Sequence, residues 1–234
     1  MRELEARAEF RFEATRSSGP VSALLLRPAA ARWLLVLAHG AGAGMRHPFM
    51  EAVAHGLAAC GIATLRYQFP YMEHGRGRPD PPPFLTATVR SAVAAAARAA
   101  PELPLLAGGK SLGGRMTSHA AAAAPLPGVR GLVFFGFPLH AAGKPSAGRG
   151  DHLARVQVPM LFLQGTRDAL ADLAFVRPLC VELGARATLH ETEDADHSFH
   201  VPKRSGRTDP EVLEELARTV SDWADSLVSR GALA

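Results

Sequence analysis

The sequence predicts an α/β fold in which one mostly parallel sheet carries helices on both faces. Strand-like and helix-like segments alternate along nearly the whole chain, after two strand-like segments that open it. Several of the strand-like segments, such as Trp33–Ala38, are continuously apolar, which is typical of a strand covered on both faces. No linker-like stretch divides the 234 residues, so we predict a single domain over residues 1–234.

Eight segments have the apolar or alternating pattern of strands. They are Glu9–Ala14, Val21–Arg27, Trp33–Ala38, Ile62–Arg66, Leu103–Ala107, Val129–Phe135, Met160–Gln164 and Ala187–Glu191. The segments between them have helical periodicity or helix-favouring composition. We predict helices over Pro48–Cys60, Phe84–Ala100, Leu112–Ala124 and Ala169–Leu183.

The clearest helix is at the C-terminus. We expect Asp209 to cap it, Pro210 to occupy its first position and Gly231 to end it, with apolar residues recurring every three or four positions between them. One segment breaks the alternation. Pro70–Pro83 is rich in Pro, Gly and Arg and follows a strand, so we expect a long loop at the edge of the sheet where α/β proteins bind ligands.

Composition excludes several classes of function. No apolar run approaches the length of a membrane span, so no membrane association is expected. The N-terminus has no apolar core typical of a secretory signal, and the two cysteines, Cys60 and Cys180, are expected to be reduced; both favour a cytoplasmic location. The net charge is +4, but the basic residues are scattered and almost all of them are arginine, which is typical of a GC-rich bacterial genome. We therefore expect no nucleic-acid partner.

The strongest chemical signal is the pattern Gly109-Lys110-Ser111-Leu112-Gly113, between a predicted strand and a predicted helix. A serine on such a tight turn needs small neighbours, and the turn projects its hydroxyl above the sheet, so we predict Ser111 to be a nucleophile. The alternative is a helix-capping serine. The same residues contain Gly-Lys-Ser, but a phosphate-binding loop requires glycine at position 104, which is Pro104.

A serine nucleophile needs a base and an acid that orients the base. Asp168 follows a predicted buried strand, and His197 follows the last one, so both are expected at the same sheet edge as Ser111. The alternatives are Asp172 for the acid and His200 for the base. A metal site formed by His190, His197 and His200 has no supporting carboxylate motif, so neither a metal nor another cofactor is expected.

Small residues follow the third strand in His39-Gly40-Ala41-Gly42-Ala43-Gly44. We expect the N–H groups of Ala41 and Leu112 to bind the oxyanion of a reacting carbonyl. A dinucleotide-binding loop is excluded because Met45 and His47 stand where its third glycine belongs. Further candidates for substrate contact are basic or polar residues, or residues that adjoin the nucleophile or the glycine-rich loop. They are His39, Gly40, Lys110, Arg115, Arg76 and Arg78, with Lys144 and Lys203 nearby.

His39 also has a second interpretation, as a residue that hydrogen bonds within the protein. The arginines and lysines can likewise be interpreted as ordinary solvated charges rather than as substrate contacts.

Taken together, these motifs resemble those of an α/β-hydrolase. The residues that carry the resemblance are Ala38-His-Gly-Ala-Gly-Ala-Gly, Phe69-Pro-Tyr-Met-Glu, Arg78-Pro-Asp, Gly108-Gly-Lys-Ser-Leu-Gly-Gly-Arg, Phe137-Pro-Leu-His, Gly143-Lys-Pro, Gln164-Gly-Thr-Arg-Asp and Asp196-His-Ser-Phe. More narrowly, the chain resembles a small dienelactone-hydrolase-like family that includes a testis-expressed animal protein and a subunit of the chromatin-modifying NSL complex.

The resemblance implies Ser111 as nucleophile, Asp168 as acid and His197 as base, on an eight-stranded α/β-hydrolase sheet. In this fold a cap grows between the sixth and seventh strands, and the interval Gly136–Pro159 is too short for one with its own core. We therefore expect an open site and a serine hydrolase that cleaves a small carboxylic ester, lactone or thioester through an acyl-enzyme. Some relatives act as scaffolds, so an interaction protein is the alternative. A homodimer of this chain is a further possibility at this point.

Overall fold

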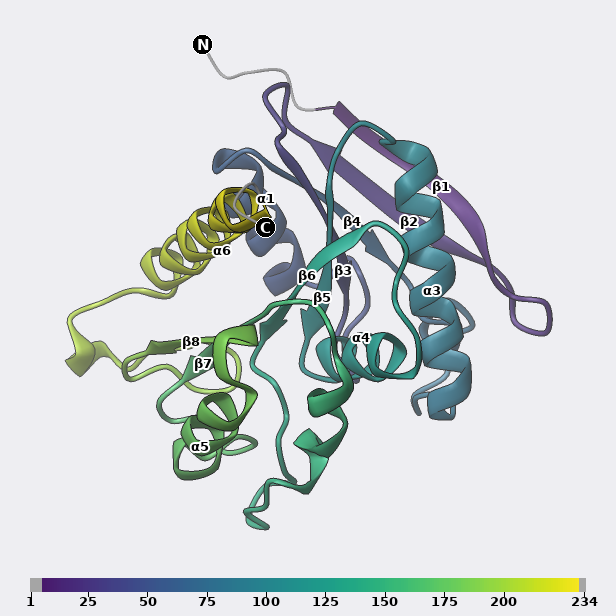
Figure 1. Ribbon diagram of the computed structural model, residues 1–234. Coiled ribbons are helices and arrows are strands. Elements are labelled where there is room, and N and C mark those ends of the chain that lie inside the picture. The colour runs from purple at the N-terminus through teal and green to yellow at the C-terminus, as the bar shows by residue number, and fades with distance from the viewer. Residues whose placement is uncertain (1–5, 232–234) are drawn as a thin grey trace.

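The structure, a computed structural model, describes residues 6–231. Its centre is an eight-stranded sheet in the order β1-β2-β4-β3-β5-β6-β7-β8 (Figure 1). The strands are β1 (Ala6–Thr15), β2 (Gly19–Arg27), β3 (Trp33–Ala38), β4 (Ile62–Tyr67), β5 (Leu105–Lys110), β6 (Val129–Phe135), β7 (Met160–Gly165) and β8 (Ala187–Thr192). β2 is antiparallel to both of its neighbours, and from β4 to β8 all strands are parallel. The predicted mostly parallel eight-stranded sheet is confirmed.

Helices cover both faces of the sheet. On one face lie α1 (Pro48–Ala59) and α6 (Asp209–Gly231); on the other lie α3 (Pro82–Ala99), α4 (Leu112–Ala123) and α5 (Leu173–Leu183) (Figure 1). Strand β3 is fully buried and alternates between the two cores. Trp33 and Leu35 pack with α1 and α6, whereas Leu34 and Val36 pack with α3 and α4. The continuous apolar runs of the sequence are therefore strands with a core on each side.

Several predicted boundaries differ from the structure by a few residues; the strand predicted over Leu103–Ala107, for example, is β5 (Leu105–Lys110). The expected loop Pro70–Pro83 begins with a short helix, α2 (Pro70–Glu73), and ends in the first turn of α3, because proline suits the first position of a helix. The predicted helix Ala169–Leu183 begins only at Leu173, where the Asp172 carboxylate accepts a hydrogen bond from the N–H of Ala174 at 2.8 Å. Asp172 is thus a helix cap.

The cap predicted for the C-terminal helix was also wrong by one residue. The Thr208 hydroxyl accepts from the N–H of Glu211 at 3.4 Å, and the Glu211 carboxylate accepts from the N–H of Thr208 at 2.7 Å, which is a reciprocal capping box. Asp209 instead accepts a hydrogen bond from the N–H of Val201 at 3.0 Å. Its carboxylate therefore ties the start of α6 to the segment that follows His197.

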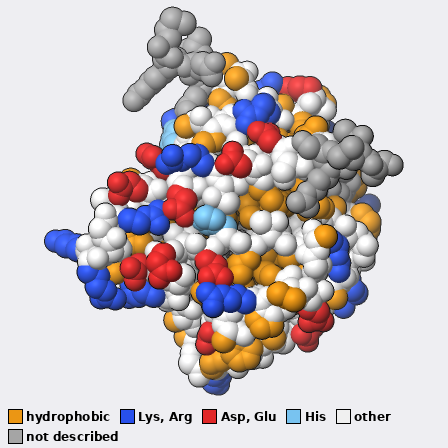
Figure 2. Space-filling model, turned by 60° about the vertical axis from the view of Figure 1, so that its left-hand side comes forward, with side chains coloured by type: hydrophobic (Ala, Val, Ile, Leu, Met, Phe, Trp, Pro, Cys, Tyr) orange, Lys and Arg blue, Asp and Glu red, His pale blue; other side chains and the backbone are white. Residues whose placement is uncertain are grey.

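In the part of the chain that the structure describes, no cap domain covers the sheet. The interval between β6 and β7 contains a 3₁₀ segment, η1 (Gly148–Arg155), that packs beside α4 and α5. Among residues 6–231, no helix is both long and apolar enough to cross a bilayer. On the face shown in Figure 2, basic and acidic side chains are interspersed, which agrees with the scattered charge of the sequence.

Candidate active site

Ser111 lies on a sharp turn between β5 and α4. Its φ is 51° and its ψ is −115°, a strained conformation for a residue other than glycine. The turn is held by a hydrogen bond from the Ser111 N–H to the carbonyl of Phe135 at 3.1 Å. A Cβ on Gly109 or on Gly113 would collide with the carbonyl oxygen of Ala38, so the neighbouring strand leaves room only for glycine. The motif therefore forms the strained turn that its sequence predicts.

The side chains of Ser111, His197 and Asp168 form a continuous hydrogen-bonded row. His197 Nε2 lies 2.9 Å from Ser111 Oγ, and His197 Nδ1 lies 2.7 Å from Asp168 Oδ2. Asp168 can only accept at Oδ2 while ionised, so Nδ1 carries the ring proton and Nε2 is free to accept the serine proton. Asp168 is fully buried, whereas about a quarter of the His197 side chain is exposed. This is the geometry in which an imidazole can deprotonate the serine.

Two further groups fix the Asp168 carboxylate. Gln164, at the end of β7, donates a hydrogen bond from Nε2 to Oδ2 at 2.5 Å, and the N–H of Leu170 donates to Oδ1 at 2.8 Å. Gln164 Oε1 accepts in turn from the N–H of Phe137 at 3.1 Å. These hydrogen bonds to both carboxylate oxygens hold the carboxylate in the orientation that faces His197. We missed this role of Gln164; a buried amide at the end of an otherwise apolar strand is the signal that could have revealed it.

The segment that carries His197 is a tight and strained turn. Asp196 Oδ1 accepts hydrogen bonds from the N–H groups of Ser198 and His200 at 2.7 and 3.0 Å. Phe199 has a φ of 62° and is almost completely buried. A bulky residue adopts this conformation only where its surroundings impose it. The strain fixes the backbone next to the imidazole, so the ring is oriented before a substrate arrives.

The Lys110 ammonium is turned toward Phe49 and Phe199 at the cleft wall and stabilises the same turn. Its Nζ donates a hydrogen bond to the carbonyl oxygen of His197 and lies 5.7 and 5.5 Å from the ring centres of Phe49 and Phe199. The two rings are stacked at 6.1 Å. Burial lowers the pKa of Lys110 to about 8, against the opposing effect of Asp168 and Asp196. The ammonium is thus a support for His197 rather than a free charge for a ligand.

His39 is buried beneath the glycine-rich loop, outside the cleft. Its Nε2 accepts from the N–H of Phe69 at 3.0 Å, and its Nδ1 lies 2.7 Å from the carbonyl oxygen of Gly40. Burial lowers the pKa of His39 to about 4, so it is neutral and Nδ1 donates to Gly40. The Tyr71 hydroxyl donates to the carbonyl of Ala41 at 2.9 Å. Both side chains orient the loop, and His39 matches its interpretation as an internal hydrogen-bonding residue.

A cleft of about 400 Å³ opens in front of Ser111. Most of its lining is loop backbone and apolar side chain. The lining residues are Gly40, Ala41, Gly42, Ala43, His47, Phe49, Met50, Lys110, Ser111, Leu170, His197 and Ser198. The expected oxyanion donors are compatible with this position, because Ala41 lines the cleft and Leu112 begins α4, where the N–H groups of a helix have no partner within it.

The other basic residues expected at the site do not line this cleft. Arg76 pairs with Asp80 at 3.2 Å, and Arg78, Arg115, Lys144 and Lys203 are likewise absent from the lining. Of the sequence candidates for substrate contact, the structure places only Gly40 and Lys110 at the cleft wall. The sequence pattern could not separate them, because the direction of a side chain is set by tertiary packing.

The alternative histidines have other partners. His200 lies 2.9 Å from Asp209, and His190 lies 2.7 Å from Glu215. No group of three or more metal-ligating side chains occurs within residues 6–231.

A second serine–histidine pair lies two turns along α4. Ser118 Oγ is 2.7 Å from His152 Nε2, a spacing that also fits part of a triad. Ser118 lies within the helix, is completely buried and is also 2.8 Å from the carbonyl oxygen of Arg115. The neighbours of His152 are His119 and the cations Arg115 and Arg155, and burial together with these neighbours lowers its pKa to about 3. This pair has neither the carboxylate nor the opening that the Ser111 site has.

The fold and this site together define an α/β-hydrolase. The family described as "Alpha/beta hydrolase domain" matches residues 31–225, and the chain belongs to that family.

Solved structures with the same fold include a dienelactone hydrolase from Anabaena variabilis (21% identity, TM-score 0.74, covering 94% of this chain and 96% of that one). They also include an α/β serine hydrolase without a lid from Xanthomonas campestris (22% identity, TM-score 0.72, covering 93% and 94%). A third is the esterase domain of a Rhodothermus marinus protein (16% identity, TM-score 0.69, covering 94% and 98%).

Proposed function

We propose that this protein is a serine esterase that cleaves small, uncharged carboxylic esters. The observation that carries the proposal is the row Ser111–His197–Asp168, with spacings of 2.9 and 2.7 Å, at the base of an open cleft. Membership of the hydrolase family supports it. Lactones and thioesters react through the same tetrahedral chemistry and belong to the same proposal.

In the first half of the reaction, His197 Nε2 takes the proton of Ser111, and Oγ attacks the ester carbonyl. The negative oxygen of the tetrahedral intermediate is bound by the N–H groups of Ala41 and Leu112. Asp168 stabilises the imidazolium, which then protonates the departing alkoxide to release an alcohol. Water, deprotonated by His197, attacks the remaining acyl-Ser111 and releases the carboxylic acid with regeneration of the serine.

The shape and polarity of the cleft favour a small neutral acyl group. Phe49, Met50 and Leu170 supply the apolar wall, and the volume of about 400 Å³ leaves little room for a long chain without a lid to cover it. Lys110 is the one Lys or Arg in the cleft lining of the described residues, and its ammonium is already bonded to the carbonyl of His197. A carboxylate on the substrate would therefore find no unengaged cation there.

The test is a series of p-nitrophenyl esters assayed with the wild type and with Ser111→Ala. We expect the acetate and butyrate to be cleaved with a higher kcat/KM than the octanoate. We also expect the neutral butyrate to be preferred over a hemisuccinate of the same chain length. An equal or greater rate with the hemisuccinate would contradict the uncharged-substrate proposal. A folded wild type that cleaves no ester of the series would contradict the esterase proposal and favour the alternative, a hydrolase-fold interaction protein.

A further inference from the structure

Strand β1 forms an open edge of the sheet. It pairs with β2 on one side, and the sheet order ends there. Among residues 6–231, no strand pairs with the opposite side of β1, so its backbone groups can pair with another strand. At its end, the carbonyl of Ala14 accepts a hydrogen bond from Ser91 Oγ of α3 at 2.8 Å, so α3 closes the edge at that point. The open part is residues 7–13.

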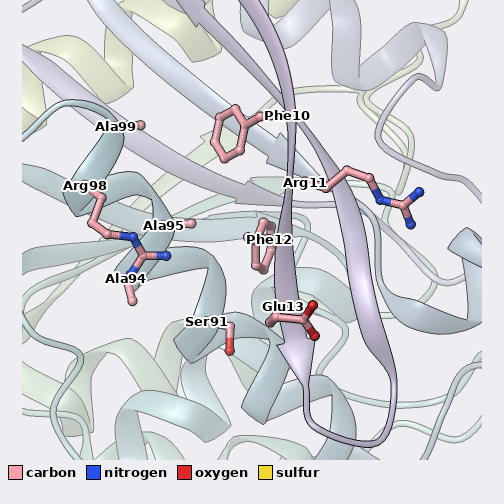
Figure 3. A pocket seen from close by; sticks show the side chains of 9 residues that line it. All are labelled: Phe10, Arg11, Phe12, Glu13, Ser91, Ala94, Ala95, Arg98 and Ala99. Carbon is pink, nitrogen blue, oxygen red and sulfur yellow. The ribbon is translucent and has the colours of Figure 1, made fainter.

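The two faces of β1 differ in character. Phe10 and Phe12 point toward α3, where they line a groove of about 550 Å³ with the small side chains Ala94, Ala95 and Ala99 (Figure 3). Phe12 is buried, whereas Phe10 is only partly covered. Arg11 points to the opposite side of the strand (Figure 3). The groove shares no lining residue with the cleft at Ser111.

The face turned away from α3 carries a strictly alternating set of charges, namely Arg7, Glu9, Arg11 and Glu13. All four residues are exposed. Charged side chains on an edge strand oppose pairing with another strand, and charges of one sign do so in every register because like charges repel. Alternating signs do not protect an edge in this way. Whether they repel or attract depends on the register of the second strand.

One register makes every opposing pair attractive. When two copies of β1 run antiparallel about a two-fold axis through Phe10, Arg7 of each copy lies opposite Glu13 of the other. Glu9 of each copy then lies opposite Arg11 of the other, and the two Phe10 side chains meet on the α3 face. A shift of the axis by one residue, to position 9 or 11, places like charges opposite each other: Arg7 opposite Arg11, or Glu9 opposite Glu13.

We infer that the β1 edge is the interface between two copies of this chain. The two sheets join through backbone hydrogen bonds, the alternating charges set the register, and Phe10 of each copy covers the open end of the groove of the other. In the single chain, Arg46 pairs with Glu9 where both side chains are exposed, and exposed pairs hold their side chains weakly. Arg11 pairs with Glu73, whose side chain is largely buried, and Arg7 lies 3.1 Å from His55, so these contacts have to be shared or exchanged when the two edges pair. This inference is independent of the proposed function.

The test is the molar mass in solution, measured by light scattering and by sedimentation over a range of concentrations. The wild type is expected to be a dimer. Glu13→Arg places arginine opposite Arg7 at both ends of the interface and should raise the dissociation constant by about tenfold or more. The double variant Arg7→Glu/Glu13→Arg restores opposite charges and should restore the dimer. Arg7→Glu mixed with Glu13→Arg should form a heterodimer.

Melting temperature and esterase activity of each variant serve as controls for folding. A monomeric wild type at all concentrations would overturn the inference. So would a Glu13→Arg variant that dimerises as tightly as the wild type, because the interface would then lie elsewhere.

Cross-linking tests the register directly. In a Cys60→Ala background, Phe10→Cys places two thiols next to each other across the two-fold axis, about 5 Å apart between Cα atoms. In Ala8→Cys, the two thiols are offset by four residues, about 13 Å along the strand. Oxidation should yield a disulfide-linked dimer of the first variant and not of the second. Equal cross-linking of the two, or of Ala8→Cys alone, would overturn the proposed register.

Discussion

The two serine–histidine pairs at α4 have nearly the same hydrogen-bond length and very different surroundings. Ser111 Oγ lies 2.9 Å from His197, and Ser118 Oγ lies 2.7 Å from His152. The ring of His197 faces the buried carboxylate of Asp168, whereas the ring of His152 is stacked 3.6 Å from His119. Reaction of a serine requires an imidazole that can accept a positive charge. The carboxylate stabilises that charge in one pair, and cations oppose it in the other.

The two serine–histidine pairs also differ in whether a substrate can reach the serine. The strained turn between β5 and α4 projects Ser111 into the cleft, whereas Ser118 faces the interior from the middle of the helix. The comparison teaches that the distance between a serine and a histidine does not identify a nucleophile. A nucleophile is identified by the carboxylate next to the histidine and by the position of the serine at the start of the helix.

The largest expected effect is the difference in kcat between the two serine-to-alanine variants. Ser111→Ala should reduce kcat for ester cleavage by about four to six orders of magnitude, because nucleophile and base act as a unit. Ser118→Ala should change kcat by no more than about twofold, as expected of a residue outside the reaction. Initial rates with p-nitrophenyl acetate measure both. A large loss of kcat with Ser118→Ala in protein that is still folded at the assay temperature would reverse our assignment of the two pairs.

The next effect concerns the carboxylate that distinguishes the pairs. Asp168→Asn should lower kcat by about four orders of magnitude, the loss seen when the equivalent residue of a serine protease is changed, because the amide reverses the ring tautomer. Asp172→Asn is the matched control. Asp172 caps α5 and should leave kcat nearly unchanged. Similar kcat values for the two variants would show that Asp168 does not orient the base.

A smaller effect is expected at Lys110, which supports only the His197 turn. Lys110→Met should lower kcat roughly tenfold to a hundredfold through loss of a charge-assisted hydrogen bond, and Lys110→Arg should retain more of it. Below pH 8 the wild-type ammonium is protonated; above pH 8 it loses its proton and donates less strongly. The groups that face it are Asp168, Asp196 and His197.

The wild-type rate should therefore fall above pH 8, and that of Lys110→Arg should persist to higher pH, because guanidinium stays charged. Profiles of kcat against pH for the two proteins measure the difference. Identical alkaline limbs would show that Lys110 acts through packing alone.

The smallest effect on activity belongs to the second pair, where we expect a change in stability instead. Ser118→Ala leaves the buried Nε2 of His152 without its partner and should lower the free energy of unfolding by about 1–2 kcal/mol. Urea titration followed by circular dichroism measures it. Unchanged stability would mean that the Ser118–His152 hydrogen bond contributes nothing to folding.

The sequence predicted the parts of the site that depend on strand ends. Ser111 and Asp168 follow apolar runs, and His197 follows the last predicted strand. All three segments become parallel strands, which end at one edge of the sheet. The eight strands and most of the helices followed from the same apolar patterns. Two helix starts differ from the prediction, because the caps at Asp172 and Thr208 are side-chain hydrogen bonds that the apolar pattern does not locate.

Side-chain direction could not be predicted in the same way. Lys110 adjoins the nucleophile in sequence but turns back toward Phe49 and Phe199, and Arg115 follows Ser111 by one turn without reaching the cleft. Gln164 carries no motif of its own and gains its role from the carboxylate it contacts. These roles depend on contacts between distant segments, which a local pattern does not encode.

The most direct test of the central claim is labelling with a fluorophosphonate, which reacts with activated serines whatever the natural substrate is. Trypsin separates the two serines, because Lys110, Arg115 and Arg130 place Ser111 in the peptide 111–115 and Ser118 in the peptide 116–130. We predict stoichiometric phosphonylation of the peptide 111–115 by mass spectrometry, and none in Ser111→Ala. Label on the peptide 116–130, or no label on folded wild-type protein, would contradict the claim that Ser111 is the activated nucleophile.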